Sequence, residues 1–271
     1  MISVIKAEMQ LASVEACEIL MAELSENNFY AFEQNENVLF AYIKEEDFNE
    51  GKLKIILPEN TAYKYSVIED RNWNQEWESQ LQPVAINNFA GIRASFHKAL
   101  KNVEHEIIIT PKMSFGTGHH ATTFLMIDLM QKINFKNKTV LDFGTGTGVL
   151  AILADKLGAT SVTAIDYDEW SINNAFENIE ANNCKHILLE KRDNIIGLPI
   201  VDIILANINL NVLESNAENL SMLLQPGSLL IVSGFLSKDE EAIVTIFVKN
   251  RLVKKHISQK DGWIALLFEK H

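Results

Sequence analysis

The sequence has few of the residues that mark disulfide scaffolds and membrane proteins. Its 271 residues include only two cysteines, Cys17 and Cys184. They are too few and too far apart to predict a disulfide framework or a zinc site. No run of about eighteen apolar residues is present, and the N-terminus has no basic segment followed by an apolar stretch of signal length. We therefore expect a cytoplasmic protein with no metal and no membrane partner.

Positive charge is also scarce. The chain has 24 Lys and Arg against 36 Asp and Glu, a formal net charge of −12. An extended nucleic-acid surface needs clustered Lys and Arg, so we expect no direct contact with nucleic acid and consider a basic partner instead. Many cytosolic proteins are acidic for solubility alone, and charge by itself favours that simpler explanation.

The most informative stretch is residues 139–150, Thr-Val-Leu-Asp-Phe-Gly-Thr-Gly-Thr-Gly-Val-Leu. A short apolar run typical of a buried strand leads into Gly144, Gly146 and Gly148, and helical spacing then continues to Gly158. Alternate glycines let the backbone pass close beneath a ligand, and the free amides at the start of the helix face it. The pattern predicts a strand, a ligand-binding turn and a helix, although a turn needed only for packing is the simpler alternative.

Two carboxylates favour a cationic ligand over a dinucleotide. The dinucleotide spacing requires a third glycine where Val149 stands, and Asp142 at the end of the strand would repel a pyrophosphate but attract an ammonium group. S-adenosylmethionine carries positive charge on its amino group and its sulfonium. A second predicted strand, 161–165, ends in Asp166, about twenty residues past the glycines, where a carboxylate can accept hydrogen bonds from both ribose hydroxyls.

These residues resemble the motifs of a known class. The stretch from Asp142 to Gly148 resembles the first motif of the class I methyltransferases, and Asp166 their second. Methyltransferases that act on nitrogen often place an Asn or Asp at the end of the strand beside the glycine turn, where Asn207 stands here, followed by Ile-Asn-Leu. Such an amide could orient an incoming amine. The alternative, a cap for a helix beginning near Asn209, has equal weight on physical grounds.

The order of the predicted elements gives the fold. Residues 1–60 read as a small α+β domain, 61–92 as a connector, and 93–271 as alternating strands and helices ending in a hairpin. This order predicts a mostly parallel sheet with one antiparallel strand, which the class resemblance sharpens to an α/β, Rossmann-like, seven-stranded methyltransferase sheet. The strands predicted for this sheet are the short apolar run that starts at Val140 and those at 161–165, 187–190, 201–206, 228–233, 251–258 and 263–268.

Two further stretches carry open alternatives. Trp73 and Trp77 lie four residues apart in the connector and predict either a packed helix face or a hinge or substrate platform. Residues 111–123 contain a glycine pair before an apolar helix and could cover the cofactor as a lid. His119 and His120 in that loop have no carboxylate or cysteine at ligand spacing, so we predict no metal there.

Four short segments narrow the class to a family. Residues 115–118, 142–144, 206–208 and 233–236, together with the small leading domain, resemble the ribosomal protein L-eleven methyltransferases over most of the chain. The sequence departs from that family mainly around residues 45–51, where the second helix of the leading domain is shortened.

The resemblance implies an activity and a set of site residues. The activity is transfer of methyl groups from S-adenosylmethionine to lysine and N-terminal amines of that basic ribosomal protein, with residues 1–60 recognising the substrate. The implied cofactor residues are Thr123, Gly144, Asp166 and Asn207, with Asp142 and Gly146 in the same turn and Asp193 facing the adenine amino group. Asn207 is the candidate for orienting the amine.

Three alternatives remain from the sequence alone. The rivals are a class I enzyme acting on another protein, one acting on a small-molecule amine, and a non-catalytic nucleotide-binding module. We expect a monomer.

Overall fold

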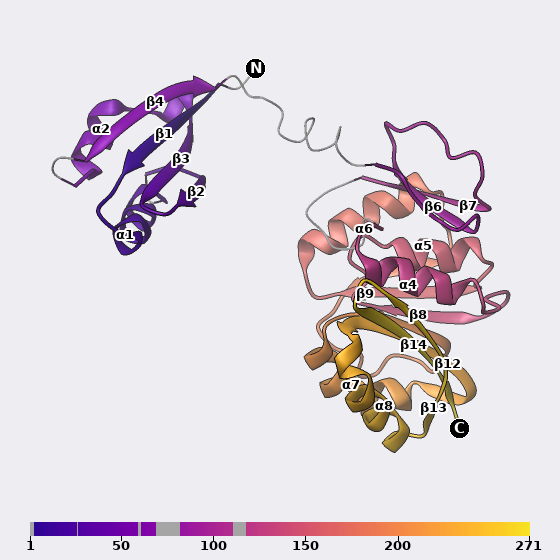
Figure 1. Cartoon of the computed structure of the whole chain (residues 1–271). Helices are drawn as coiled ribbons and strands as arrows, with labels where there is room; N and C mark the ends of the chain where they lie inside the picture. Colours follow the sequence, from indigo (N-terminus) through magenta and orange to yellow (C-terminus); the bar gives the residue numbers. More distant parts are fainter. Residues whose placement is uncertain (1–2, 26, 59–60, 69–81, 111–117) are drawn as a thin grey trace. The chain divides into compact units, whose positions relative to one another are not determined.

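The computed structural model describes residues 3–25, 27–58, 61–68, 82–110 and 118–271. The chain divides into two compact units, Met1–Leu81 and Gln82–His271 (Figure 1). Trp73, Trp77 and the first part of the predicted lid lie outside the described residues, so their roles stay predictions. Among the helices that the structure describes, none combines the length and apolar character needed to cross a membrane.

The first unit is a four-stranded antiparallel sheet with helices packed on its core. The strand order is β2-β3-β1-β4. Ile5, Ala7 and Met9 of β1 point to the core that α1 and α2 cover, as the alternation of an antiparallel strand requires. The Ser13 hydroxyl caps α1, accepting a hydrogen bond from the Ala16 amide at 3.1 Å. The elements are β1 Val4–Gln10, α1 Val14–Ser25, β2 Ala31–Asn35, β3 Val38–Lys44, the 3-10 turn η1 Glu45–Asp47, α2 Glu50–Ile56 and β4 Ala62–Ile68.

The predicted connector at 61–92 is wrong at both ends. Strand β4 pairs with β1 along its whole length, from Val4 opposite Ile68 to Gln10 opposite Ala62, so it completes the first sheet. At the other end, β5 (Val84–Ile86) and β6 (Ala90–Ala94) lie in the second unit. The pairing of β4 with β1 joins residues more than fifty positions apart, so it could not be read from the sequence that follows Pro58.

The second unit contains the seven-stranded sheet that the sequence predicts. Its order is β10-β9-β8-β11-β12-β14-β13, and β14 runs antiparallel to both of its neighbours while β8 to β12 pair in parallel. Asp261 and Gly262, with φ of 50° and 79°, form the two-residue turn of the final hairpin. The strands are β8 Thr139–Phe143, β9 Ser161–Asp166, β10 Ile187–Lys191, β11 Val201–Asn207, β12 Leu224–Leu236, β13 Leu252–Lys260 and β14 Trp263–Lys270.

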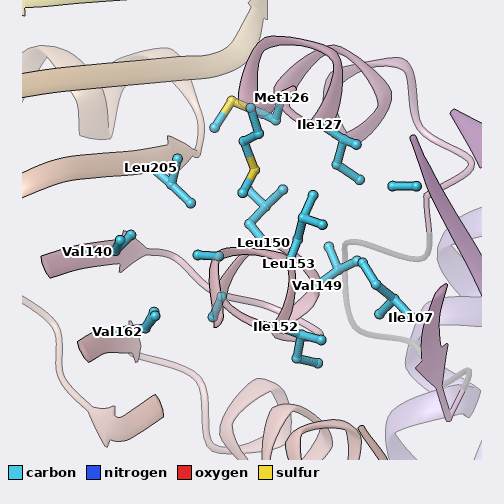
Figure 2. Close-up of a cluster of buried hydrophobic side chains, with 14 of the residues drawn as sticks. Ile107, Met126, Ile127, Val140, Val149, Leu150, Ile152, Leu153, Val162 and Leu205 are labelled. Atoms are coloured by element: carbon cyan, nitrogen blue, oxygen red, sulfur yellow. The ribbon is translucent and has the colours of Figure 1, made fainter. Parts of the chain in front are cut away.

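Helices cover both faces of this sheet (Figure 1). Val140, Val162 and Leu205 point from one face into a cluster with α4 (Ala121–Met130), α5 (Val149–Lys156) and α6 (Glu169–Ala181). Figure 2 shows these side chains around Leu150 and Leu153 of α5. The opposite face packs against α7 (Leu210–Met222) and α8 (Glu240–Lys249). Burial on both faces explains why the central strands are almost continuously apolar.

A second, smaller sheet extends the α4 to α6 side of this unit. Strand β6 pairs with β5 antiparallel and with β7 (His105–Ile109) parallel. Ile107 and Ile109 of β7 are buried in the same cluster as α5. Strand β7 therefore lies beside α5 and α6, the helices that follow the glycine turn.

Candidate functional site

The ends of three neighbouring strands bring the predicted polar residues to one edge of the sheet. In the register of β8, Asp142 lies opposite Ala164 of β9 and Leu205 of β11. Asp166 and Asn207 are the last residues of β9 and β11. The carboxyl ends of parallel strands form the usual ligand-binding edge of such a sheet, so the structure places all three where the sequence predicted.

The glycine turn adopts the backbone that glycine favours. Gly144, Gly146 and Gly148 have φ of 77°, 54° and 80°, in the left-handed region that other residues seldom occupy. The amides of Gly144 and Thr145 both donate to the Ile165 carbonyl at 2.9 Å, which ties the turn to the end of β9. The turn then leads directly into α5, whose first amides lie at the same edge.

Asp142 is buried and only half of its carboxylate has a partner. Its Oδ2 accepts hydrogen bonds from Thr145 Oγ1 at 2.6 Å and from the Ala151 amide at 3.2 Å. Its Oδ1 is buried and has no hydrogen-bond partner among the described residues. Burial raises the pKa of Asp142 from 3.8 to about 7, opposed by the hydrogen bonds from Thr145 and Ala151, while repulsion from Asp166 adds to the rise. A cationic group beside Oδ1 would stabilise the ionised form.

Asp166 holds the turn from the side of β9. Its Oδ2 accepts from the Gly146 amide at 2.9 Å, and its Oδ1 accepts from the Asp168 amide at 3.0 Å. Each carboxylate oxygen can accept a second hydrogen bond, so these contacts leave capacity for hydroxyl donors. The two acids thus secure successive residues of the turn, Asp142 through Thr145 and Asp166 through Gly146. The ribose contact of Asp166 stays a prediction.

The structure separates the two roles that the sequence left open for Asn207. The cap of α7 is Asn209, whose side chain accepts from the Val212 amide at 3.0 Å. Asn207 is not needed for that role, and its Oδ1 is buried without a hydrogen-bond partner among the described residues.

Two glycines hold the backbone that follows Asn207. A Cβ at Gly144 would collide with the Ile208 side chain, and one at Gly234 would collide with the Ile208 carbonyl. The Ile208 amide donates to the Ser233 carbonyl at 3.2 Å. Sequence reasoning cited Gly234 only for its resemblance to a family segment and missed this contact. Gly234 lies within β12, at a shift in register between Ser233 and Phe235, and a glycine inside an apolar strand was the available signal.

Thr123 and the two histidines occupy the start of α4. Thr123 is fully buried, and its Oγ1 has no partner within the described part of the chain. His120 caps the helix, with Nδ1 accepting from the Thr122 amide, and its ring lies edge-on to Trp263 at 4.7 Å. His119 Nε2 hydrogen-bonds to the Gln82 carbonyl at 3.0 Å. Among the described residues, no three His, Cys, Asp or Glu side chains gather closely enough to hold a metal ion.

Asp193 lies just beyond the end of β10. The Arg192 amide donates to the Asp166 carbonyl at 2.8 Å, which places the following residue beside the end of β9. The Asp193 side chain is exposed and accepts from Asn194 Nδ2 at 2.7 Å. Its contact with adenine stays a prediction.

Comparison with known proteins identifies the family. The family model described as "Ribosomal protein L11 methyltransferase (PrmA)" matches residues 4–271. The chain belongs to this family. A curated relative of the same name from Bacteroides thetaiotaomicron is 38% identical over 260 residues, 93% of each chain. Another from Chlorobaculum tepidum is 36% identical over 266 residues, covering 93% of this chain and 92% of the relative.

A solved structure agrees with this membership. The crystal structure of ribosomal protein L11 methylase from Lactobacillus delbrueckii subsp. bulgaricus superposes with a TM-score of 0.65 at 28% identity. The match covers 70% of this chain and 100% of that one. The protein is therefore an S-adenosylmethionine-dependent methyltransferase of the L11 methyltransferase family.

The site geometry fits that cofactor. Thr123 Oγ1, Asp142 Oδ1 and Asn207 Oδ1 are buried acceptors, and none has a partner within the ranges that the structure describes. Acceptor oxygens of this kind suit a ligand that brings N–H donors, and the Asp142 carboxylate in addition attracts positive charge and would repel a diphosphate. The fit agrees with the sequence argument that the turn accommodates a cation.

Proposed function

We propose that this methyltransferase transfers methyl groups to lysine side chains and the N-terminal amine of ribosomal protein L11. The relatives that carry this name align with 93% of the chain, which supports the substrate. We infer the reaction type from Asn207, whose Oδ1 is a buried hydrogen-bond acceptor at the end of β11. The next residue, Ile208, is held between Gly144 and Gly234. An acceptor fixed in this way suits an incoming amine.

The residues of the chain act mainly by orientation. The bound cofactor supplies a methyl group already activated by the sulfonium. Asn207 Oδ1 accepts a hydrogen bond from the amine and so directs its lone pair, while the Ser233 carbonyl and Gly234 keep the Ile208 backbone in place. In-line placement of two reacting groups accounts for roughly 7 to 11 kcal/mol of a barrier.

The amine must be neutral when it reacts. A free lysine has a pKa of about 10.4, and both the like charge of the cofactor and partial desolvation lower that pKa at the site. Water then takes the proton. We assign no obligatory general base.

The first unit is the proposed recognition module for a basic substrate. Residues 1–81 contain 16 acidic and 6 basic side chains, a net charge of −10, whereas residues 82–271 contain 20 acidic and 18 basic ones, a net charge of −2. Almost all of the net negative charge of the protein therefore belongs to the smaller unit. Charge of this density raises the rate at which an oppositely charged protein is captured. We place this reaction in the cytoplasm, carried out by a monomer without nucleic-acid or membrane partners.

The reaction is tested with labelled S-adenosylmethionine, purified L11 and the Asn207→Ala variant. We expect label to enter L11 with the wild-type protein. The variant should lose at least tenfold in kcat, a larger loss than any loss of affinity for the cofactor, to which Asn207 is also predicted to bind. Mass spectrometry of the labelled protein identifies the modified amines. Transfer to a small amine but not to L11 would contradict the proposed substrate.

The recognition role is tested by neutralising exposed acids. Glu45→Gln together with Glu46→Gln removes two charges from η1, and Glu214→Gln together with Glu218→Gln removes two from α7. We expect the first pair to raise the KM for L11 by several-fold and the second to raise it less, with cofactor affinity unchanged in both. Equal effects of the two pairs would contradict a recognition role for the first unit.

A further inference from the structure

Helix α6 carries a row of asparagines that faces the edge of β7. Asn174, Asn178 and Asn182 are spaced four residues apart and therefore lie on one face of the helix. Asn182 accepts from the Ile108 amide at 3.0 Å and donates to the Ile108 carbonyl at 2.6 Å. Asn178 accepts from the Thr110 amide at 2.7 Å, and Asn174 donates to the Thr110 carbonyl at 3.0 Å. The side-chain amides thus replace the neighbouring strand that β7 lacks on this side.

Asn178 differs from the rest of the row because it also reaches the glycine turn. Its Nδ2 donates to the Thr147 carbonyl at 2.8 Å, and Thr147 stands between Gly146 and Gly148. One fully buried carboxamide therefore joins the end of β7 to the turn under the cofactor. A carboxamide can do so because it offers a donor and an acceptor on one rigid plane.

Close packing of α6 on the turn makes this contact possible. A Cβ at Gly148 would lie 3.3 Å from the Ala175 Cβ, tighter than ordinary van der Waals contact. Two small residues therefore allow the helix to approach the turn, and Asn178 follows Ala175 by one helical turn on the buried face.

We propose that Asn178 is a positioning residue for the cofactor. Asp166 fixes the Gly146 amide at 2.9 Å from the side of β9, and Asn178 fixes the carbonyl of the following residue, Thr147, from the side of α6. Glycine allows the neighbouring peptide groups to rotate at little cost, so the turn depends on these external contacts for a single conformation. Asn178 therefore preorganises the turn for binding, without itself belonging to the predicted cofactor contacts. This inference rests on the placement of the cofactor over the glycine turn.

Asn182 provides a matched control for the test. Both side chains accept a hydrogen bond from a backbone amide, Asn182 from Ile108 in β7 and Asn178 from Thr110 just after it. Both also donate through Nδ2, but Asn182 donates to the Ile108 carbonyl and Asn178 to the glycine turn. At a pH where the introduced carboxyls are ionised, Asn178→Asp and Asn182→Asp keep the acceptor and remove the donor in both cases. The added negative charge would attract a cationic ligand, so weaker binding could not be attributed to charge.

The experiment measures the dissociation constant and the KM of S-adenosylmethionine, kcat and the melting temperature for the wild-type protein and both variants. We expect both variants to melt at a lower temperature. Asn178→Asp should weaken cofactor binding at least tenfold and raise the KM, whereas Asn182→Asp should bind within about twofold of the wild type. Equal weakening by the two variants, or unchanged binding by Asn178→Asp, would overturn the proposal.

A second variant covers the case in which Asn178→Asp does not fold. Asn178→Ser is neutral and keeps a hydroxyl that can donate, but its shorter side chain cannot span both partners. We expect intermediate weakening of cofactor binding, and wild-type affinity would overturn the proposal. Cofactor binding is the readout throughout, so a wild-type protein that binds S-adenosylmethionine but leaves L11 unmethylated would refute only the substrate.

Discussion

The affinity for S-adenosylmethionine should rise with pH because Asp142 must lose a proton to meet a cation. Burial raises the pKa of this carboxyl to about 7, so at pH values well below that it is mostly neutral in the free protein. Its Oδ1 has no hydrogen-bond partner among the described residues and is the atom available to the positively charged part of the ligand. A cationic ligand binds best to the ionised form of Asp142. At low pH part of the binding free energy is therefore spent on removing the proton from this carboxyl.

The size of the effect follows from the distance between the pH and the pKa. At about pH 5.5 the carboxyl is roughly 1.5 pH units below its pKa, which costs about 2 kcal/mol and weakens binding about thirtyfold. At about pH 7.5 this cost is nearly gone. Above that pH the α-amino group of the ligand, with a pKa of about 7.7 to 8.0, begins to lose its own charge, so the affinity should stop rising with pH.

The stability of the free protein should change in the opposite direction. The folded-state pKa of Asp142 lies above the unfolded value of 3.8, so its favourable contribution is complete below that pH and is lost as the pH rises to about 7. The loss amounts to on the order of 4 kcal/mol, at about 1.4 kcal/mol per pH unit. A saturating concentration of the cofactor should offset this loss.

Calorimetry of ligand binding between pH 5.5 and 7.5, in buffers with different ionisation enthalpies, measures both the affinity and the number of protons released. We expect close to one proton to be released at the lowest pH. The control is Asp142→Asn, which preserves size and the hydrogen bond from Thr145 but cannot titrate. An affinity in the wild-type protein that does not change with pH, or the same change in the Asn variant, would refute an electrostatic role for Asp142.

Two substitutions test other parts of the site. Asp166→Ala should weaken cofactor binding by about 1.5 to 3 kcal/mol, the range for lost hydrogen bonds to a charged group, and calorimetry showing wild-type affinity would remove Asp166 from the site. Gly234→Ala places a Cβ against the Ile208 carbonyl at a φ of 102°, so kcat should fall at least tenfold while cofactor affinity stays within about twofold. Gly227→Ala, with a φ of 87° and open space around it, is the matched control, and equal kinetics of the two variants would contradict the role of Gly234.

The sequence predicted the features that depend on local pattern. The alternate glycines, the acids at two strand ends and the Asp261-Gly262 hairpin are all encoded within a few residues, and the structure confirms them. The boundary of the first unit failed because β4 joins β1, more than fifty residues away. Such a pairing leaves no mark on the local pattern of either strand.

In the candidate site, too, local sequence pattern predicts some features and long-range contacts determine others. Asn207 and Asn209 are identical residues two positions apart, and only the hydrogen bond to Val212 shows which of them caps the helix. Asn178 was overlooked because it belongs to a predicted helix with many polar residues. Three asparagines at four-residue spacing were the available signal, since they occupy a face that should otherwise be apolar.

The concentration of acidic residues in the first unit has a consequence for repeated reaction. Methylation of lysine preserves the positive charge of its nitrogen, so a substrate that has received one methyl group is attracted as strongly as an unmodified one. The negative charge of the first unit would therefore attract methylated and unmethylated substrate equally. In the proposed reaction, each methyl group replaces an N–H from which Asn207 would accept a hydrogen bond. A limit on repeated methylation would therefore depend on that amide rather than on the charge of the first unit.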